Sequence, residues 1–275
     1  MLLGFNGATG MNYDLETDIR LAKQAGFELL EIWAAKLNKY LESNSLESLK
    51  QLFEEAGIKP YSINSIEFIT FKQGRDYENI KTECERLCRI AKELSCPKIV
   101  VVPSPTPPGA TQQDILEESV RVLRELSTIA GKYNVDLAFE FLGFSHISVS
   151  RLEQCSRIVQ ETDRPNIGLV LDTFHFYAGG SNVEEIDGVD KDKIFIFHIN
   201  DAEDREKSQL EDAHRLFPGE GVIPLTDILK SLKRIGYDNM VSIELFRPEY
   251  WGLPPSELGA RSFESVERVL KGIYS

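Results

Sequence analysis

Short apolar runs alternate with longer amphipathic segments along the whole chain. The runs are rich in β-branched, aromatic and leucine side chains, which favours strands. Eight strands are predicted, at Leu2–Asn6, Leu29–Trp33, Lys59–Asn64, Lys98–Pro103, Val135–Phe141, Ile167–Thr173, Ile194–Asp201 and Met240–Phe246. The intervening periodicity predicts helices at Asp14–Ala25, Leu46–Ala56, Tyr77–Leu94, Gln112–Tyr133, Val149–Gln160, Val183–Val189, Leu225–Ile235 and Pro255–Ile273. The chain is therefore predicted to consist of repeated strand–helix units.

Several of these strands are apolar along their length instead of alternating with polar residues. Ile99–Val102 and Ile167–Leu171 are examples, and this pattern is typical of parallel strands that are covered on both faces. Eight such units in 275 residues predict an α/β fold, a single (β/α)₈ TIM barrel that forms one domain over residues 1–275. An open, doubly wound sheet is the alternative, but no glycine-rich nucleotide-binding loop follows any of the strands.

Charged or polar side chains interrupt the last four predicted strands near their carboxyl ends, at Glu140, Asp172, His198 and Glu244. The active site of a TIM barrel lies at that end of the strands. Buried carboxylates repel one another unless a positive charge compensates them. Any one of these residues alone could be an ordinary polar group or half of an ion pair. Together they predict one divalent metal ion, with Mn²⁺, Zn²⁺ or Co²⁺ favoured by the ligand types and Mg²⁺ tolerated.

Other polar and aromatic residues follow the same strand ends. His175 comes three residues after Asp172, a place that suits a group that moves a proton or orients a hydroxyl. Arg215 and Arg247 follow the last two strands, where either one can polarise a substrate oxygen or pair with an acid. Further candidates for substrate binding are Glu31, Trp33 and Asn64, at the ends of the second and third strands.

The net charge narrows the class of partner. Lys plus Arg number 31 against 44 Asp plus Glu, which gives a formal charge of −13. An acidic surface repels phosphate backbones and anionic lipid, so we expect a small-molecule substrate and no nucleic acid or membrane partner. The N-terminus lacks the basic region of a signal peptide, and the four cysteines lack paired C-x-x-C spacing, which fits a reducing cytoplasm.

Six segments carry a resemblance to a known family: Gly4–Thr9, Ala138–Phe141, Gly168–Phe176, Ile194–Ile199, Pro218–Gly221 and Val241–Tyr250. The chain resembles the xylose isomerase-like TIM-barrel superfamily of sugar isomerases and epimerases, and within it the inosose isomerase family. The resemblance implies that Glu140, Asp172, His198 and Glu244 hold one divalent ion. It also implies that His175 and Arg215 line the substrate pocket.

The resemblance also implies a reaction. A ketone moves between adjacent carbons of an inosose, from 2-keto-myo-inositol to 1-keto-D-chiro-inositol, through an enediolate and as part of inositol catabolism. Glu140 or Glu244 is expected to carry the carbon-bound proton, and His175 is expected to act at oxygen. A ketose 3-epimerase or a hydroxypyruvate isomerase would use the same metal ligands and differ in the pocket walls. A monomer and a homodimer are both compatible with the sequence.

Two other classes of protein fit this sequence less well. An abasic-site endonuclease on the same barrel needs more histidine ligands than the four histidines of this chain, as well as a basic face for DNA. A non-catalytic sugar-binding barrel has no reason to bury three acidic residues together.

Overall fold

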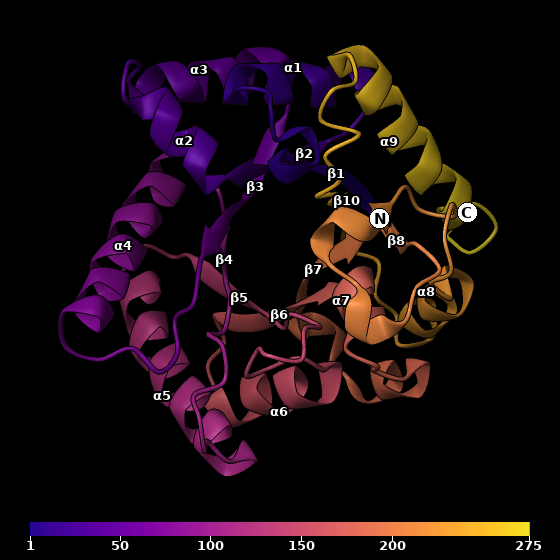
Figure 1. Ribbon diagram of the computed structural model, residues 1–275. Helices are drawn as coiled ribbons and strands as arrows, with labels where there is room; N and C mark the ends of the chain where they lie inside the picture. The colour runs from indigo at the N-terminus through magenta and orange to yellow at the C-terminus, as the bar shows by residue number, and fades with distance from the viewer. Residues whose placement is uncertain (275) are drawn as a thin grey trace.

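The computed structural model describes residues 1–274 and has a closed barrel of parallel strands at its centre (Figure 1). Around the barrel the strands follow one another in the order β1-β10-β7-β6-β5-β4-β3-β2. Their bounds are β1 (Leu2–Asn6), β2 (Leu29–Trp33), β3 (Lys59–Ile66), β4 (Lys98–Val101), β5 (Asp136–Glu140), β6 (Ile167–Asp172), β7 (Ile194–Ile199) and β10 (Met240–Ile243). The predicted (β/α)₈ barrel is confirmed.

Helices surround the barrel on its outer side, as Figure 1 shows. They are α1 (Leu15–Ala25), α2 (Ala34–Leu41), α3 (Leu46–Ala56), α4 (Gly74–Glu93), α5 (Gln112–Gly131), α6 (Leu152–Thr162), α7 (Thr173–Ala178), α8 (Leu225–Arg234) and α9 (Pro255–Leu270). Local signals fix several ends. Asp14 caps α1 by accepting a hydrogen bond from the Thr17 amide, and Gly26 ends the same helix in the left-handed conformation, at a φ of 102°.

Three parts of the predicted element order differ from the structure. The segment predicted as a helix at Val183–Val189 is a short 3₁₀ helix, η2 (Val183–Gly188), instead of an α-helix. The sequence pattern does not predict α2 or α7, which begin directly after β2 and β6. The seventh strand is predicted to reach Asp201, whereas β7 ends at Ile199 and a separate short ribbon follows, formed by β8 (Asp201–Ala202) and β9 (Arg215–Leu216).

The apolar side chains form two layers. One cluster inside the barrel contains residues of several strands, among them Leu29, Val100, Ala138, Val170 and Ile196. A larger cluster joins the outer faces of the strands to the surrounding helices. Burial of this kind supplies the main favourable term in folding. No helix within residues 1–274 is long and apolar enough to cross a membrane.

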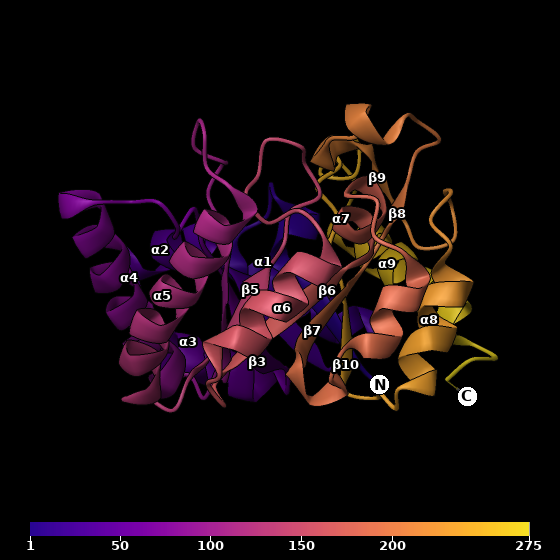
Figure 2. The same cartoon turned by 90° about the horizontal axis from the view of Figure 1, so that it is seen from below.

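The two ends of the barrel differ in what covers them. In Figure 2, α7 and the β8–β9 ribbon project beyond the carboxyl ends of the strands, whereas the N-terminus lies at the opposite end. The carboxyl end is therefore the side on which the added elements of the fold position functional side chains.

Candidate metal centre and substrate cavity

The structure brings the four predicted metal ligands together at the carboxyl end of the barrel. Glu140 and Asp172 are the last residues of β5 and β6, His198 lies in β7, and Glu244 directly follows β10. Asp172 and His198 are direct neighbours in the strand register. One ligand atom from each of the four lies within 4.8 Å of those of the others, and all four residues are buried.

The imidazole of His198 lies at the centre of this cluster. Its Nδ1 atom is 3.2 Å from Glu140 Oε1, 3.3 Å from Glu244 Oε2 and 3.7 Å from Asp172 Oδ2. Although burial acts in the opposite direction, the charges of Glu244 and Glu31 raise the pKa of His198 well above its ordinary value. The site therefore favours a positive charge at this point, and its oxygen and nitrogen donors fit one divalent ion.

Asp172 is held as an anion by its neighbours. Its Oδ2 accepts hydrogen bonds from Arg215 Nη1 at 2.7 Å and from Asn200 Nδ2 at 2.9 Å, and its Oδ1 accepts one from the His175 amide at 2.8 Å. Burial disfavours the charge, but the Arg215 guanidinium, the two nearby histidines and the His175 amide together outweigh it and lower the pKa of Asp172 to about 2. An ionised carboxylate is the form that binds a metal.

Glu244 and Glu140 have different surroundings. Glu244 Oε1 accepts hydrogen bonds from Asn6 Nδ2 at 2.9 Å and Asn64 Nδ2 at 2.8 Å, and Glu244 Oε2 lies 3.2 Å from Arg215 Nη1. Glu140, within residues 1–274, has a hydrogen-bond partner only in His198. Burial raises the pKa of Glu140 to about 8, and the charges of Glu244 and Asp172 act in the same direction. Glu140 therefore tends to hold a proton in the metal-free protein.

The β8–β9 ribbon places Arg215 beside the cluster. Arg215 is fully buried. Its guanidinium carbon Cζ lies 4.9 Å from the ring centroid of Phe174 and 5.1 Å from that of Phe246. Its Nη2 lies 3.0 Å from His175 Nε2 and donates to Asp212 Oδ1 at 2.9 Å. One side chain thus connects two metal ligands with His175.

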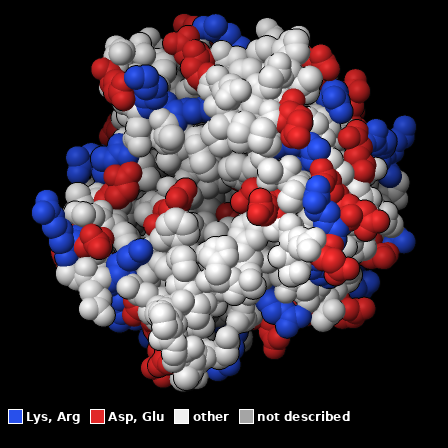
Figure 3. All heavy atoms as spheres, viewed as in Figure 1, with Lys and Arg blue, Asp and Glu red and all other residues white. Residues whose placement is uncertain are grey.

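A cavity of about 350 Å³ opens onto the cluster. Glu140, Glu244, His175 and Arg215 form its polar side, and its apolar walls include Trp33, Phe68, Phe144 and Phe246. Figure 3 shows a hollow near the centre of this face, with acidic side chains at its edge. Aromatic walls with a few polar groups at one side are typical of a small-molecule site.

Most of the predicted substrate-binding residues line this cavity, namely Trp33, Asn64 and Arg215. The other two residues, Glu31 and Arg247, lie outside the cavity lining. Glu31 is fully buried, and its Oε1 lies 2.9 Å from His198 Nε2. Arg247 is also outside the lining, because its Nη1 donates to Glu203 Oε1 at 2.7 Å.

Four further residues of the site, Asn6, Asn200, Asp212 and Phe246, were not predicted as site residues from the sequence. Asn6 ends β1 as a polar side chain after an apolar run, which is the same signal that identified the metal ligands. Asn200, Asp212 and Phe246 carry no such signal, since their positions depend on the short ribbon and on the turn after β10.

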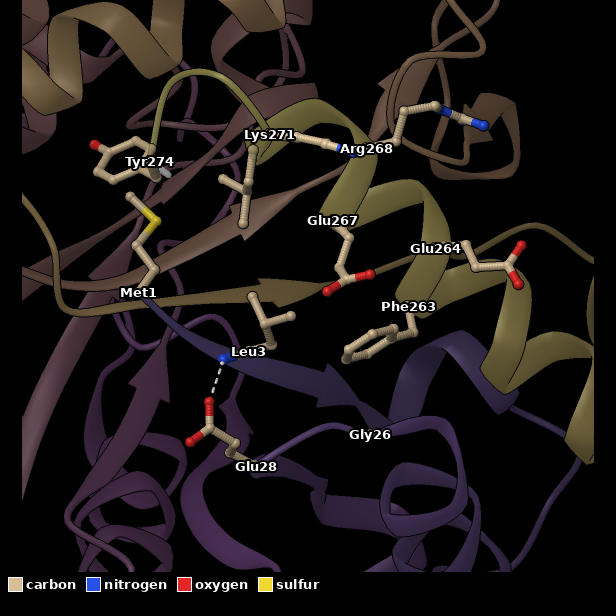
Figure 4. A pocket seen from close by; sticks show the side chains of 11 residues that line it. Met1, Leu3, Gly26, Glu28, Phe263, Glu264, Glu267, Arg268, Lys271 and Tyr274 are labelled. Carbon is tan, nitrogen blue, oxygen red and sulfur yellow. Dashed lines mark hydrogen bonds between the residues drawn. The ribbon is translucent and has the colours of Figure 1, made fainter.

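A second and larger cavity, of about 790 Å³, lies near the amino ends of the strands. Figure 4 shows it between β1 and α9, with Met1, Leu3 and Phe263 beside the charged side chains of Glu267 and Lys271. The four metal ligands contribute nothing to its lining. The larger of the two cavities is therefore not the one that adjoins the candidate metal site.

Comparisons with known proteins agree with this geometry. A family model described as a xylose isomerase-like TIM barrel matches residues 19–268. The inosose isomerase of Bacillus subtilis is 40% identical over 277 residues, with 100% of both chains covered. That of Halalkalibacterium halodurans is 40% identical over 259 residues, covering 94% of this chain and 92% of the relative.

A solved structure of the IOLI protein with a bound zinc atom has a TM-score of 0.97 and 38% identity, with 100% of both chains covered. The chain therefore belongs to the xylose isomerase-like TIM-barrel family, together with the inosose isomerases to which it is similar over its full length.

Proposed function

We propose that this protein is a metal-dependent isomerase that moves a ketone between adjacent carbons of an inosose, from 2-keto-myo-inositol to 1-keto-D-chiro-inositol, in inositol catabolism. The observation that carries the proposal is the buried group of three carboxylates and one imidazole that faces the cavity. The full-length similarity to inosose isomerases supports the choice of substrate.

A divalent ion held by Glu140, Asp172, His198 and Glu244 would supply a Lewis acid that makes the hydrogen beside a ketone more acidic. The protein's part is to take that hydrogen as a proton, to return one to the former ketone carbon, and to let the hydroxyl proton pass from its oxygen to the former ketone oxygen. Glu140 lines the cavity, and among the described residues only His198 forms a hydrogen bond with it. A group of this kind can act as base and then as acid near neutral pH.

Glu244 differs from Glu140 because both of its oxygens accept hydrogen bonds from amide or guanidinium groups. These donors stabilise its anionic form and fix its position. We therefore assign the carbon-bound proton to Glu140 and a positioning and charge-holding role to Glu244.

His175 is assigned to the substrate oxygens. Arginine can only donate hydrogen bonds, so His175 Nε2, 3.0 Å from Arg215 Nη2, must accept one. The ring proton is then on Nδ1, a buried atom for which the described residues supply no partner. His175 lines the cavity but its Nδ1 has no accessible surface in the substrate-free structure, so this N–H can donate to a substrate oxygen, and stabilise negative charge there, only after a small shift of the ring or the cavity wall.

The walls of the cavity suit a keto-polyol. Trp33 and Phe246, whose ring centroids are 5.5 Å apart, offer apolar surface for C–H groups, while Asn64 can reach hydroxyls on the same side. We propose that the protein acts on this small molecule in the cytoplasm, as a monomer or a homodimer and without nucleic acid or membrane partners. The four cysteines are buried and free, which fits a reducing compartment.

The test is to incubate metal-loaded and chelator-treated protein with 2-keto-myo-inositol in D₂O and to follow the products by NMR. We expect a product only with metal, with solvent deuterium at the new C–H. A product without deuterium would support the substrate assignment but contradict proton transfer through an exchangeable proton on Glu140. If a metal-loaded, folded sample forms no product, the inosose assignment is refuted. Substrates of ketose 3-epimerases and hydroxypyruvate isomerases would then be assayed next.

A further inference from the structure

Glu31 is a fully buried carboxylate on β2 that is not one of the four metal ligands. Three donors surround it. Ser62 Oγ donates to Glu31 Oε2 at 2.6 Å, while Asn6 Nδ2 and His198 Nε2 lie 3.3 Å and 2.9 Å from Glu31 Oε1. Asn6 and Ser62 are the register neighbours of Glu31 on β1 and β3. The barrel therefore surrounds this carboxylate with hydrogen-bond donors instead of leaving it as an isolated charge.

The contacts of His198 divide between its two ring nitrogens. Nε2 faces Glu31, and Nδ1 faces the three carboxylates of the metal cluster. An ionised carboxylate only accepts hydrogen bonds, so the pair with Glu31 keeps a proton on Nε2. In the neutral ring, the lone pair is then on Nδ1 and points into the ligand cluster.

We infer that Glu31 is a positioning residue of the metal centre, which acts by accepting the Nε2–H of His198 and so presenting Nδ1 as the metal ligand. This role replaces the direct substrate contact that its place at a strand end suggested. The inference depends on the metal site of the proposed function, and it is tested without substrate so that the two can fail separately.

A second contact extends the effect of Glu31 to another ligand. Asn6 Nδ2 lies 2.9 Å from Glu244 Oε1 and 3.3 Å from Glu31 Oε1, so one amide group connects both carboxylates. Hydrogen-bond partners of metal-ligating histidines contribute about 10- to 100-fold to metal affinity. We expect loss of the Glu31 charge to weaken metal binding by a factor in that range.

The first experiment compares Mn²⁺ and Zn²⁺ affinity of the wild type and of Glu31→Gln by competition with a chelator. Glu28→Gln is the matched control, because it removes the same charge from an exposed residue just before β2. We expect affinity about 10- to 100-fold weaker for Glu31→Gln and unchanged for Glu28→Gln. Ser62→Ala, which removes one donor to Glu31, should weaken binding by less, and it tests the inference if Glu31→Gln does not fold.

A double-mutant cycle shows whether Glu31 acts through His198. If it does, Glu31→Gln should cost much less metal affinity in the His198→Asn background than in the wild type, and only the part that passes through Asn6 should remain. Additive losses, or an affinity of Glu31→Gln within about twofold of the wild type, would overturn the inference.

The tautomer of His198 provides a readout that a merely structural role would not change. The chain has only four histidines, so ¹⁵N-edited NMR of the zinc-loaded protein can resolve each ring. We expect a protonated Nε2 and a metal-bound Nδ1 for His198 in the wild type, and a weaker Nε2–H hydrogen bond in Glu31→Gln. Zinc bound to Nε2 in the wild type would contradict the assignment.

Discussion

Arg215 Nη2 and His175 Nε2 lie 3.0 Å apart, so the guanidinium donates a hydrogen bond and the imidazole accepts it. Burial lowers the pKa of His175, and the nearby Arg215 charge acts in the same direction, against Asp172. His175 is therefore a neutral ring at the cavity wall, with its Nδ1–H directed away from Arg215. Its assigned task is to donate a hydrogen bond to the substrate.

His175→Ala is expected to lower kcat/KM by about 100-fold, because removal of one preorganised donor at a developing charge typically has an effect of that size. Since His175 is neutral in the folded protein, the pH dependence of the remaining activity should match the wild type between pH 6 and pH 8. Steady-state kinetics across that range provides the measurement. A limb of the wild-type profile that disappears in the variant would show instead that His175 titrates during turnover.

Glu140 and Glu244 are expected to differ when each is replaced by glutamine at saturating metal. Glu140→Gln should lower the exchange of the substrate C–H with D₂O by about 10²- to 10⁴-fold, the usual contribution of a general acid–base group. Glu244→Gln should weaken metal binding, because it removes a hydrogen-bonded anion, but retain measurable exchange. NMR exchange rates, with metal content determined on the same samples, test this pair. The opposite pattern would assign the carbon-bound proton to Glu244.

Metal binding is expected to release protons and to become tighter as pH rises. Burial raises the pKa of Glu140 to about 8, so the metal-free protein keeps a proton there at pH 7 that the ion must displace. Each proton released changes the dissociation constant by about tenfold per pH unit below that pKa. Calorimetric titration with Mn²⁺ at pH 6.5 and 8.5, in buffers of different ionisation enthalpy, measures both quantities. Binding that is equally tight and releases no proton at both pH values would contradict the assignment.

Parts of this molecule were predictable from local pattern alone. The bounds of β1 and β2 agree with the predicted strands because apolar runs of that length have one interpretation in a repeated strand–helix pattern. The last strand was predicted to reach Phe246, but β10 ends at Ile243, just before Glu244 turns into the ligand cluster. A carboxylate in an apolar run is visible in the sequence. The residue at which strand pairing ends depends on the neighbouring strands and is not visible there.

Residues that depend on tertiary pairing could not be placed in this way. Arg215 and Arg247 both follow strands and look equivalent in the sequence, but β8–β9 brings Arg215 to Asp172 while Glu203 holds Arg247 elsewhere. Glu31 was predicted at the cavity because it is polar and near a strand end. Its contact with His198 comes from β7, which is not a neighbour of β2 in the barrel, and no local sequence pattern predicts such a contact.

The last prediction concerns stability and depends on Lys36 of α2. Its Nζ lies 2.6 Å from Asp18 Oδ2 and donates to the carbonyl oxygens of Gly7 and Gly10 at 2.8 Å each. All of these groups are buried, and the two carbonyls belong to the short helix η1 (Gly7–Gly10) that follows Asn6. Lys36→Met leaves Asp18 without its positive partner. Such a loss typically destabilises a protein by about 3–5 kcal/mol.

This loss should depend on pH. Burial raises the pKa of Asp18 from 3.8 to about 7 even though Lys36 opposes it, and removal of Lys36 raises it further. The folded state then keeps a proton that the unfolded chain releases near pH 3.8, so the contribution of Asp18 to stability is full below that pH and is lost as pH rises through the folded-state pKa, which lies above 7 in the variant. Urea unfolding of Lys36→Met should therefore show a larger loss at pH 8.5 than at pH 5.5. Arg20→Met, which breaks the exposed pair with Glu16 on α1, is the control and should cost under about 1 kcal/mol. Equal losses for Lys36→Met at both pH values would show that Asp18 stays ionised in the folded protein.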